Sequence, residues 1–253
     1  MTMIREDTVF GPIHSRRLGS SLGVNLLPRN GKICNFDCVY CECGWNKDGL
    51  GDKKIATAAE VETALGAKLR ECSANGTPID SITFSGDGEP TLNPDFPGII
   101  DITLSLRDEF FPSSKVSVLS NATRLGAPGV LEALRKVDNP ILKIDAPTNE
   151  LAARINKPQG RYDVREVVEN LRCFEGDFIL QTMFLRSPDF DSSSPDCLLP
   201  WMDIVRELHP REIMAYTIDR PTPAENLGKF TVGEMWDLLR PLRDEGFNIS
   251  VRG

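Results

Sequence analysis

Three cysteines near residue 40 are the side chains whose spacing points most directly to chemistry. Cys34, Cys38 and Cys41 have the spacing C-x3-C-x2-C in the run KICNFDCVYC, which follows an apolar stretch, GVNLLP, that predicts a strand. A [4Fe–4S] cluster normally takes four cysteine ligands. Three ligands on one loop would leave one iron open to another molecule, and we expect the chemistry at that open position.

Zinc is the alternative metal for these thiols, because Cys43 lies only two residues beyond Cys41. Four neighbouring cysteines could form a tetrahedral all-thiolate site. Structural zinc sites usually use two short cysteine pairs from separate segments, however, and this sequence has no second pair. The spacing therefore favours a cluster, with Cys43 as a free thiol or an alternative ligand. The isolated Cys72, Cys173 and Cys197 are expected to pack as small apolar side chains.

The length and composition are those of an ordinary globular protein. Its 253 residues are 40% hydrophobic, which suffices for one large α/β domain or two small ones. A net charge of −8 does not favour a large nucleic-acid substrate, although a local basic patch could still bind one. The sequence has no apolar run of about 18 residues and no secretory signal at its start. We therefore expect a cytoplasmic protein that does not bind a membrane.

Strand-like and helix-like segments alternate from about residue 23 onward, which predicts βα units and a parallel sheet. Thr57 is a candidate helix N-cap. The run FNISVRG predicts an additional edge strand. The expected strands are GVNLLP, SITFSG, KVSVLSN, PILKIDA, FILQTMFL and EIMAYTID, and the expected helices cover residues 57–72, 96–110, 129–137, 163–174, 198–208 and 232–245.

A glycine-rich turn follows the second predicted strand, in FSGDGEPTLN. Gly86 and Gly88 would let the backbone approach a ligand closely, and Asp87 and Glu89 supply carboxylates. In barrels of parallel strands the reactive groups lie on loops at the carboxyl ends of the strands, which is where this turn falls. An ordinary strand-to-helix turn is the alternative.

Polar residues also follow the third predicted strand, in LSNAT. Ser120, Asn121 and Thr123 could hydrogen-bond a ribose or a carboxylate. The alternative is helix capping, for which Ser, Asn and Thr are favoured.

The fourth predicted strand ends in KIDAPTNE. Lys143 and Asp145 are two residues apart and would share one face of a regular strand. Asp145 is a candidate ligand contact, or it organises the turn before Pro147.

The last two predicted strands carry candidates for the wall of a substrate cavity. Gln181 and Met183 share a face of the fifth strand, and Tyr216, Asp219 and Arg220 end the sixth.

The cysteine motif, with the aromatic Tyr40 before its last cysteine, resembles the radical S-adenosylmethionine (SAM) superfamily. The resemblance implies an α/β fold, a partial (βα)6 barrel with a mostly parallel sheet. It also implies that Cys34, Cys38 and Cys41 hold a [4Fe–4S] cluster whose fourth iron chelates the amino and carboxylate groups of SAM. The SAM-binding residues implied are Gly86, Asp87, Gly88, Glu89, Ser120, Asn121 and Asp145.

The activity implied by this resemblance is reductive cleavage of SAM to a 5′-deoxyadenosyl radical that abstracts hydrogen from a substrate. An electron donor such as flavodoxin or ferredoxin would be a partner. One alternative is a radical SAM activating enzyme that acts on a partner protein. Another is a non-catalytic zinc or iron–sulfur module.

The segment FGPIHSRRLGSSLGVNLLP, together with CNFDCVYC, SGDGEPTL and DRP, resembles a narrower group, the small relatives of the tRNA wybutosine-pathway (4-demethylwyosine) synthase. That synthase has further cysteines upstream for a second cluster, and no cysteine precedes Cys34 here. A modified nucleoside or tRNA is thus one candidate substrate, beside a small molecule or a protein. Arg16 and Arg17 could hold an anionic substrate or the SAM carboxylate, or form a solvated turn. We expect one domain, 1–253, with an N-terminal extension over 1–22 and βα units over 23–253.

Overall fold

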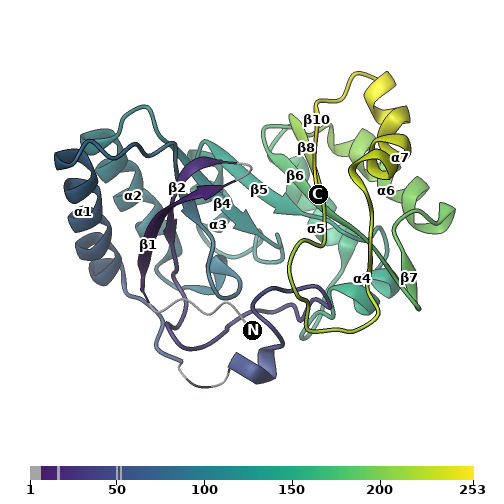
Figure 1. Ribbon diagram of the computed structural model, residues 1–253, viewed down its shortest axis with the longest axis horizontal. Coiled ribbons are helices and arrows are strands. Elements are labelled where there is room, and N and C mark those ends of the chain that lie inside the picture. The colour runs from purple at the N-terminus through teal and green to yellow at the C-terminus, as the bar shows by residue number, and fades with distance from the viewer. Residues whose placement is uncertain (1–6, 16–17, 50, 52) are drawn as a thin grey trace.

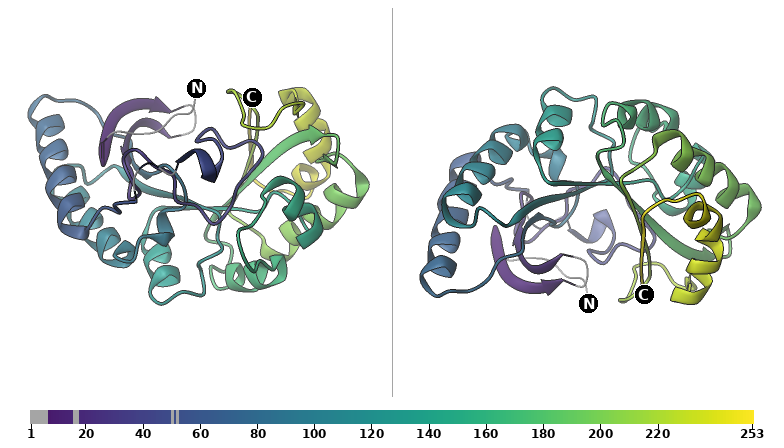
Figure 2. Two further views of the ribbon diagram at one scale, coloured as in Figure 1. Left: turned by 90° about the horizontal axis from the view of Figure 1, so that it is seen from below. Right: turned by 90° about the horizontal axis from the view of Figure 1, so that it is seen from above.

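A curved, mostly parallel sheet forms the centre of the protein, and helices cover its outer face (Figure 1, Figure 2). The computed structural model describes residues 7–15, 18–49, 51 and 53–253. The predicted α/β fold with a mostly parallel sheet is confirmed, since neighbouring strands in the following series are all parallel. The series is β2 (Gly19–Val24), β3 (Ser81–Phe84), β4 (Lys115–Ser120), β5 (Asn139–Lys143), β6 (Ile179–Ser187), β8 (Glu212–Thr217) and β10 (Ile249–Arg252).

The sheet is open, as a partial barrel requires. At one edge β1 (Val9–Ser15) pairs antiparallel with β2, and at the other β10 pairs with β8. Among the strands that the structure describes, these two edge strands do not pair with each other. Two short strands, β7 (Phe190–Asp191) and β9 (Gly228–Lys229), pair antiparallel with the end of β6.

Helices connect most of the parallel strands, and local capping explains where several of them begin. Thr57 caps the first helix as predicted: its side chain accepts the Glu60 amide, and the Glu60 side chain accepts the Thr57 amide. Thr231 and Glu234 form the same capping box on the last helix. The helices are α1 (Ala58–Ala74), α2 (Phe96–Phe110), α3 (Val130–Lys136), α4 (Asn149–Ile155), α5 (Val164–Arg172), α6 (Pro195–Leu208) and α7 (Val232–Asp244), with the 3-10 turns η1 (Asn46–Gly49) and η2 (Pro90–Leu92).

The hydrophobic core lies between the sheet and these outer helices. All four residues of β3 are buried, as expected for a parallel strand covered on both faces. Ile82 and Phe84 belong to the apolar core, whereas Ser81 and Thr83 on the other face form a chain of hydroxyl hydrogen bonds with the neighbouring strands. Leu22, Ile82 and Val116 from adjacent strands are fully covered and belong to the same cluster as α1 and α2 residues such as Leu65 and Ile99. This core holds the carboxyl ends of the strands in a common row.

The N-terminal part of the sheet differs from the prediction. The first parallel strand is Gly19–Val24 and not GVNLLP, because Asn25 turns the chain: its side chain accepts the Leu27 amide at 3.1 Å. Strand β1 was not predicted, since its sequence contains Gly and Pro and its pairing with β2 shifts register between Phe10 and Ile13. Residues 9–15 and 19–22 therefore belong to the sheet and are not an extension outside it.

Two further elements differ from the expected pattern. The short helix α4 was not predicted, and it packs near the cysteine loop. Helix α6 begins at Pro195, three residues before the predicted start, because proline fits the first turn of a helix. None of the helices in the described part of the chain is long and apolar enough to cross a membrane.

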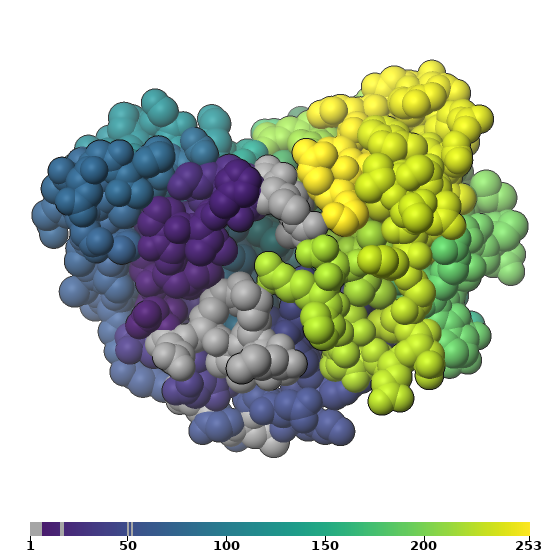
Figure 3. All heavy atoms as spheres, viewed as in Figure 1, coloured from purple at the N-terminus to yellow at the C-terminus, as the bar shows by residue number. Residues whose placement is uncertain are grey.

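The loop that follows β2 crosses the carboxyl ends of the strands, at the bottom of Figure 1. On the face shown in Figure 3, the first strands (purple) and the segments after β8 (yellow-green and yellow) are both exposed, although they are far apart in the sequence. The site described next lies under the loop after β2.

Candidate functional site

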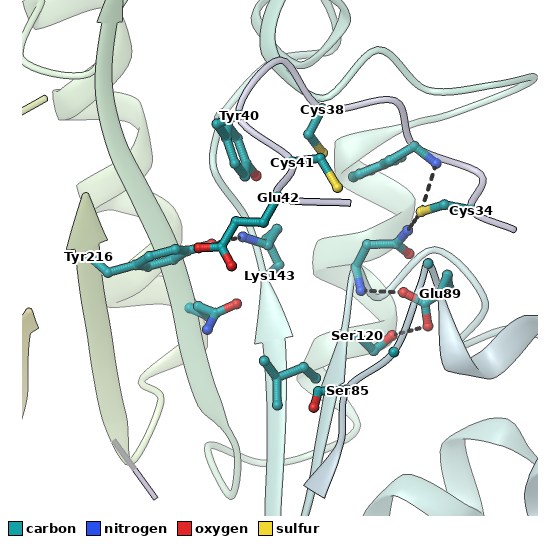
Figure 4. Close-up of a pocket in the computed structure, with 16 residues that line it drawn as sticks. Cys34, Cys38, Tyr40, Cys41, Glu42, Ser85, Glu89, Ser120, Lys143 and Tyr216 are labelled. Atoms are coloured by element: carbon teal, nitrogen blue, oxygen red, sulfur yellow. Dashed lines mark hydrogen bonds between the residues drawn. The ribbon is translucent and has the colours of Figure 1, made fainter. Parts of the chain in front are cut away.

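A cavity of about 260 Å³ lies at the carboxyl ends of the strands. Figure 4 shows the three cysteines of the motif on one side of it, with Glu89 and Ser120 on one flank and Lys143 and Tyr216 on the other. Among the described residues the lining comes from the cysteine loop and five strand ends: Cys34, Phe36, Cys38, Tyr40, Cys41, Glu42, Ser85, Gly86, Gly88, Glu89, Leu119, Ser120, Asn121, Lys143, Gln181 and Tyr216. The topology thus brings together most of the polar motifs that the sequence singled out.

The cysteine loop is held in place by backbone hydrogen bonds from α4. The Asp37 and Val39 amides each donate to a carbonyl at the end of that helix, of Asn156 and Ile155 respectively, both at 2.9 Å. On the other side of the loop, the Asn46 side-chain amide donates to the carbonyls of Cys34 (3.1 Å) and Phe36 (3.0 Å). These contacts fix the loop without using the three thiols.

Two of the three thiols face side-chain amide donors. Asn121 Nδ2 lies 3.9 Å from Cys34 Sγ, and Asn156 Nδ2 lies 3.5 Å from Cys38 Sγ. Hydrogen bonds to cysteine sulfurs are one of the means by which proteins tune iron–sulfur clusters. Cys34 and Cys38 therefore each have one amide donor near the sulfur.

The thiols differ in acidity. Burial raises the pKa of Cys38 to about 11, with the Asp145 carboxylate adding to the effect, and burial and Glu89 raise that of Cys34. The pKa of Cys41 is lowered to about 6, first by the hydrogen bond from Cys43 and then by the Lys32 ammonium, against the effect of burial. Metal binding would therefore release protons from Cys34 and Cys38.

The arrangement of these sulfurs bears on the choice between zinc and a cluster. A zinc site brings its thiolates to about 2.3 Å from one ion. Within the described residues, no group of three or more His, Cys, Asp or Glu side chains is arranged to hold a single metal ion. The three cysteines border one cavity.

The other cysteines do not line this cavity. Cys43 Sγ faces the Gly86 carbonyl (3.8 Å) and the Asp87 carboxylate (3.7 Å). Cys72 and Cys197 are buried, as predicted. The prediction was wrong for Cys173, which lies at the C-terminal cap of α5 and is exposed.

The glycine turn contacts the chain just before Cys34 as well as the cavity. Gly88 pairs with Ile33, and a Cβ at Gly88 would lie 1.8 Å from the Ile33 carbonyl oxygen. A Cβ at Gly86 would lie 2.1 Å from Asn25 Oδ1. The lack of a side chain at these positions therefore sets where the cysteine loop begins.

The two carboxylates of this turn lie in different places. Asp87 is buried, accepts a hydrogen bond from Asn25 Nδ2 at 3.3 Å and is not among the cavity-lining residues. Glu89 lines the cavity, and its Oε1 accepts from Ser120 Oγ (2.8 Å) and Thr91 Oγ1 (2.6 Å). Its Oε2 accepts the Asn121 amide at 2.7 Å, and burial raises the pKa of Glu89.

The polar residues at the end of β4 form one hydrogen-bond network with the cysteine loop. Asn121 Oδ1 accepts hydrogen bonds from the Thr123 hydroxyl (2.7 Å) and amide (3.1 Å), and Asn121 Nδ2 donates to Asn35 at 2.8 Å. Ser120 and Asn121 line the cavity, whereas Thr123 supports Asn121 from behind. Asn35 connects this network to the residue next to Cys34, a contact that the sequence did not predict.

Lys143 and Asp145 share a face, as predicted, and form a buried ion pair with Nζ and Oδ1 3.5 Å apart. Asp145 is fully covered and accepts hydrogen bonds from the Tyr40 hydroxyl, from Asn156 Nδ2 (2.7 Å) and from the Met183 amide (2.8 Å). Burial is the largest single effect and disfavours the charge of Lys143, but Asp145, Tyr216 and Cys38 together outweigh it, so the pKa of Lys143 is raised. Lys143 lines the cavity and Asp145 supports it from behind.

The candidates for a substrate wall separate in the structure. Gln181 and Tyr216 line the cavity, and Lys143 Nζ donates a hydrogen bond to the Tyr216 hydroxyl. Met183 packs in the apolar cluster beside Tyr40. Asp219 and Arg220 are not in the described lining, and Arg16 and Arg17 lie outside the described residues.

Some residues at the site were missed at the sequence level. Glu42 lines the cavity and pairs with Arg220, Nη1 to Oε2, at 2.8 Å. Because Glu42 directly follows Cys41, the sequence could have indicated that it lies at the site. Asn156 follows an unpredicted helix, and Lys32 precedes the cysteines without any local pattern, so neither could be recognised from the sequence.

Known proteins resemble this chain in sequence and in fold. The profile of the radical SAM superfamily matches residues 31–183. A UPF0026 protein of Helicobacter pylori strain J99 is 30% identical over 218 residues, which cover 85% of this chain and 67% of that protein. The chain therefore spans about two thirds of the length of that curated relative.

Two solved structures share the fold. A radical SAM methyltransferase from Sphaerobacter thermophilus superposes with a TM-score of 0.68 at 18% identity, over 92% of this chain and 65% of that one. The structure of TYW1 with a lysine–pyruvate adduct bound has a TM-score of 0.63 at 15% identity, over 91% of this chain and 76% of that one. The predicted partial barrel and the predicted likeness to the wybutosine-pathway synthase agree with these neighbours.

The chain belongs to the radical SAM superfamily. The cofactors of that superfamily are a [4Fe–4S] cluster and SAM, the two cofactors that the sequence predicts.

Proposed function

We propose that this protein is a radical SAM enzyme in which Cys34, Cys38 and Cys41 hold the cluster. The observation that carries the proposal is that the three sulfurs border one cavity together with Gly88, Glu89 and residues of the β4 end. When bound, the cluster and SAM supply reductive cleavage of the sulfonium to a 5′-deoxyadenosyl radical, which abstracts hydrogen from the substrate. The residues of this chain then have to bind, orient and shield the reactants.

Glu89 is proposed to bind the amino group of SAM, with Gly86, Gly88, Ser120 and Asn121 forming the wall around it. Glu89 Oε1 already accepts three hydrogen bonds, from the amide and the hydroxyl of Thr91 and from the Ser120 hydroxyl. Within the described residues Oε2 accepts one hydrogen bond, from the Asn121 amide, so it keeps capacity for another donor. Asp87 and Asp145, also proposed for this site, would act by holding the turn and Lys143 in position.

The opposite side of the cavity is proposed to face the substrate. Lys143, Gln181 and Tyr216 supply a cation, an amide and a phenol there. These groups suit a polar substrate, and a modified nucleoside or tRNA is the one that the narrower sequence resemblance favours. A protein substrate, as for an activating enzyme, is the alternative, and retention of the radical on a co-purified partner would distinguish it.

The remaining expectations are part of the same proposal. The electron donor would be a flavodoxin or ferredoxin. The protein would act in the cytoplasm, and residues 1–253 would form one domain.

The test is anaerobic reconstitution with iron and sulfide, followed by reduction with dithionite in the presence of SAM. We expect 5′-deoxyadenosine and methionine, quantified by mass spectrometry, from the wild-type protein and from Cys173→Ala, the exposed control. Cys34→Ala, Cys38→Ala and Cys41→Ala should each lose the product. SAM cleavage that persists in those three variants, or about one zinc per chain and no iron, would contradict the proposal.

A further inference from the structure

Lys32 is a buried lysine beside the cysteine loop, and it is not among the described residues that line the cavity. Its side chain is 1% exposed, and the backbone around Gly49 covers it, since a Cβ at Gly49 would lie 2.5 Å from Lys32 Cβ. A lysine is rarely enclosed in this way unless its charge is used or balanced. The neighbours of the ammonium group indicate where its charge acts.

The neighbours of the ammonium come from both ends of the cysteine loop. Nζ donates to the Gly44 carbonyl at 2.6 Å and lies 3.5 Å from Asp37 Oδ1. The Gly44 amide in turn donates to the Cys41 carbonyl at 3.0 Å, so the ammonium lies beside the segment that carries Cys41, and its charge lowers the pKa of the Cys41 thiol. The Asp37 carboxylate has a second partner, because the same Oδ1 accepts a hydrogen bond from the Asn46 backbone amide at 2.8 Å.

If Lys32 had only a structural role, the Gly44 carbonyl and the Asp37 carboxylate would be sufficient partners for its ammonium group. Because Gly44 is hydrogen-bonded to Cys41 and Asp37 directly precedes Cys38, these partners also put a buried positive charge close to the proposed ligands. A positive charge stabilises the more negative, reduced form of a nearby cluster, and a negative charge does the opposite. Charge and sulfur hydrogen bonds are among the factors that set cluster potentials.

We propose that Lys32 is a positioning residue that raises the reduction potential of the cluster, and that Asp37 partly offsets it. The inference rests on the proposed function, because it requires the cluster at Cys34, Cys38 and Cys41. Lys32 does not contact the cavity, so the effect would be exerted through the Cys41 thiolate and not on the substrate.

The two members of the ion pair provide a matched test, because a loss of structure and a loss of charge predict different results. Lys32→Met removes the positive charge at similar length, and Asp37→Asn removes the negative charge while its side-chain oxygen can still accept the Asn46 amide. If the pair only braced the loop, both variants would shift the potential in the same direction or leave it unchanged. If the charges act on the cluster, the shifts have opposite signs.

The measurement is an EPR-monitored redox titration of the reconstituted 253-residue chain without SAM, with iron and sulfide counted for each variant. We expect a more negative midpoint potential for Lys32→Met, a smaller shift to a more positive potential for Asp37→Asn, and no shift for Lys136→Met on the outer helix α3. If Lys32→Met cannot hold a cluster, the sign for Asp37→Asn decides, and a negative or absent shift overturns the inference.

Shifts of the same sign in both variants, or no shift in either, would overturn the inference and leave the proposed function intact. Wild-type protein that assembles no cluster would overturn the proposed function and the inference with it.

Discussion

The side-chain amide of Asn156 donates a hydrogen bond to the Asp145 carboxylate at 2.7 Å. The same amide nitrogen lies 3.5 Å from Cys38 Sγ. Asp145 thereby connects one proposed cluster ligand with Lys143, which lines the cavity on the far side of the carboxylate. A single buried acid thus orients groups on two walls of the site.

Replacement of that acid should be costly for folding. Asp145→Asn leaves the Lys143 ammonium without its buried counter-charge, and loss of one partner of a buried pair costs about 3–5 kcal/mol. Urea unfolding of the metal-free protein measures this loss. Tyr40→Phe removes one hydrogen bond to the same carboxylate and should cost about 1–3 kcal/mol. An Asp145→Asn variant no less stable than Tyr40→Phe would show that the ion pair does not stabilise the fold.

A methyl group at Gly88 should displace the start of the cysteine loop. Gly88 has a φ of +138°, and its Cβ would lie 1.8 Å from the Ile33 oxygen, so Gly88→Ala must move the residue next to Cys34. We expect a loss of most of the iron after reconstitution, measured per chain. Gly98→Ala is the matched control, because nothing lies within 4 Å of a Cβ there and alanine favours helix by about 0.5–1 kcal/mol. Equal iron content in the two variants would contradict this reading of the turn.

Glu89→Gln should weaken SAM binding. The carboxylate accepts hydrogen bonds from Thr91, Ser120 and the Asn121 amide. In glutamine one of the two oxygens is replaced by an NH2 group, which would face one of these donors and could not accept its hydrogen bond. We expect at least about a tenfold rise in the dissociation constant of the reconstituted protein for SAM, or about 1.4 kcal/mol. Equilibrium dialysis with labelled SAM measures it, with the exposed Glu62→Gln as control. Unchanged affinity in Glu89→Gln would remove Glu89 from the proposed SAM site.

Asp138 should make the protein sensitive to acid at a place remote from the cavity. Burial alone would raise its pKa, but hydrogen bonds from the Val116 amide (2.9 Å), Lys115 and Arg107 outweigh it, so the pKa of Asp138 is lowered from its usual 3.8. A lowered pKa in the folded state adds stability that is present above about pH 4 and is lost as the pH falls further. Asp138→Asn should therefore be less stable than wild type at pH 7, with a smaller difference at pH 3, as measured by urea unfolding. A difference that does not change with pH would contradict the prediction.

Local sequence patterns accounted for most of the fold. The predicted helix over 96–110 has the observed bounds of α2, and Thr57 caps α1, because side-chain periodicity and capping act within a few residues of each other. Five of the six predicted parallel strands are present, since continuous apolar runs mark strands buried on both faces, whereas the first lies at Gly19–Val24 and not at GVNLLP. Strand β1 was missed because its sequence lacks that signal, and only its pairing with β2 makes it a strand.

For the site, the sequence by itself determined the cysteine spacing, the glycine turn and the positions of polar groups at strand ends. Only the tertiary structure decided which of these groups meet. Asp87 faces Asn25, Glu89 lines the cavity, and Lys143 bonds Tyr216 across 73 residues of sequence. The physical reason is that such contacts depend on how neighbouring strands and the cysteine loop pack, and this long-range packing leaves no repeating pattern along the chain.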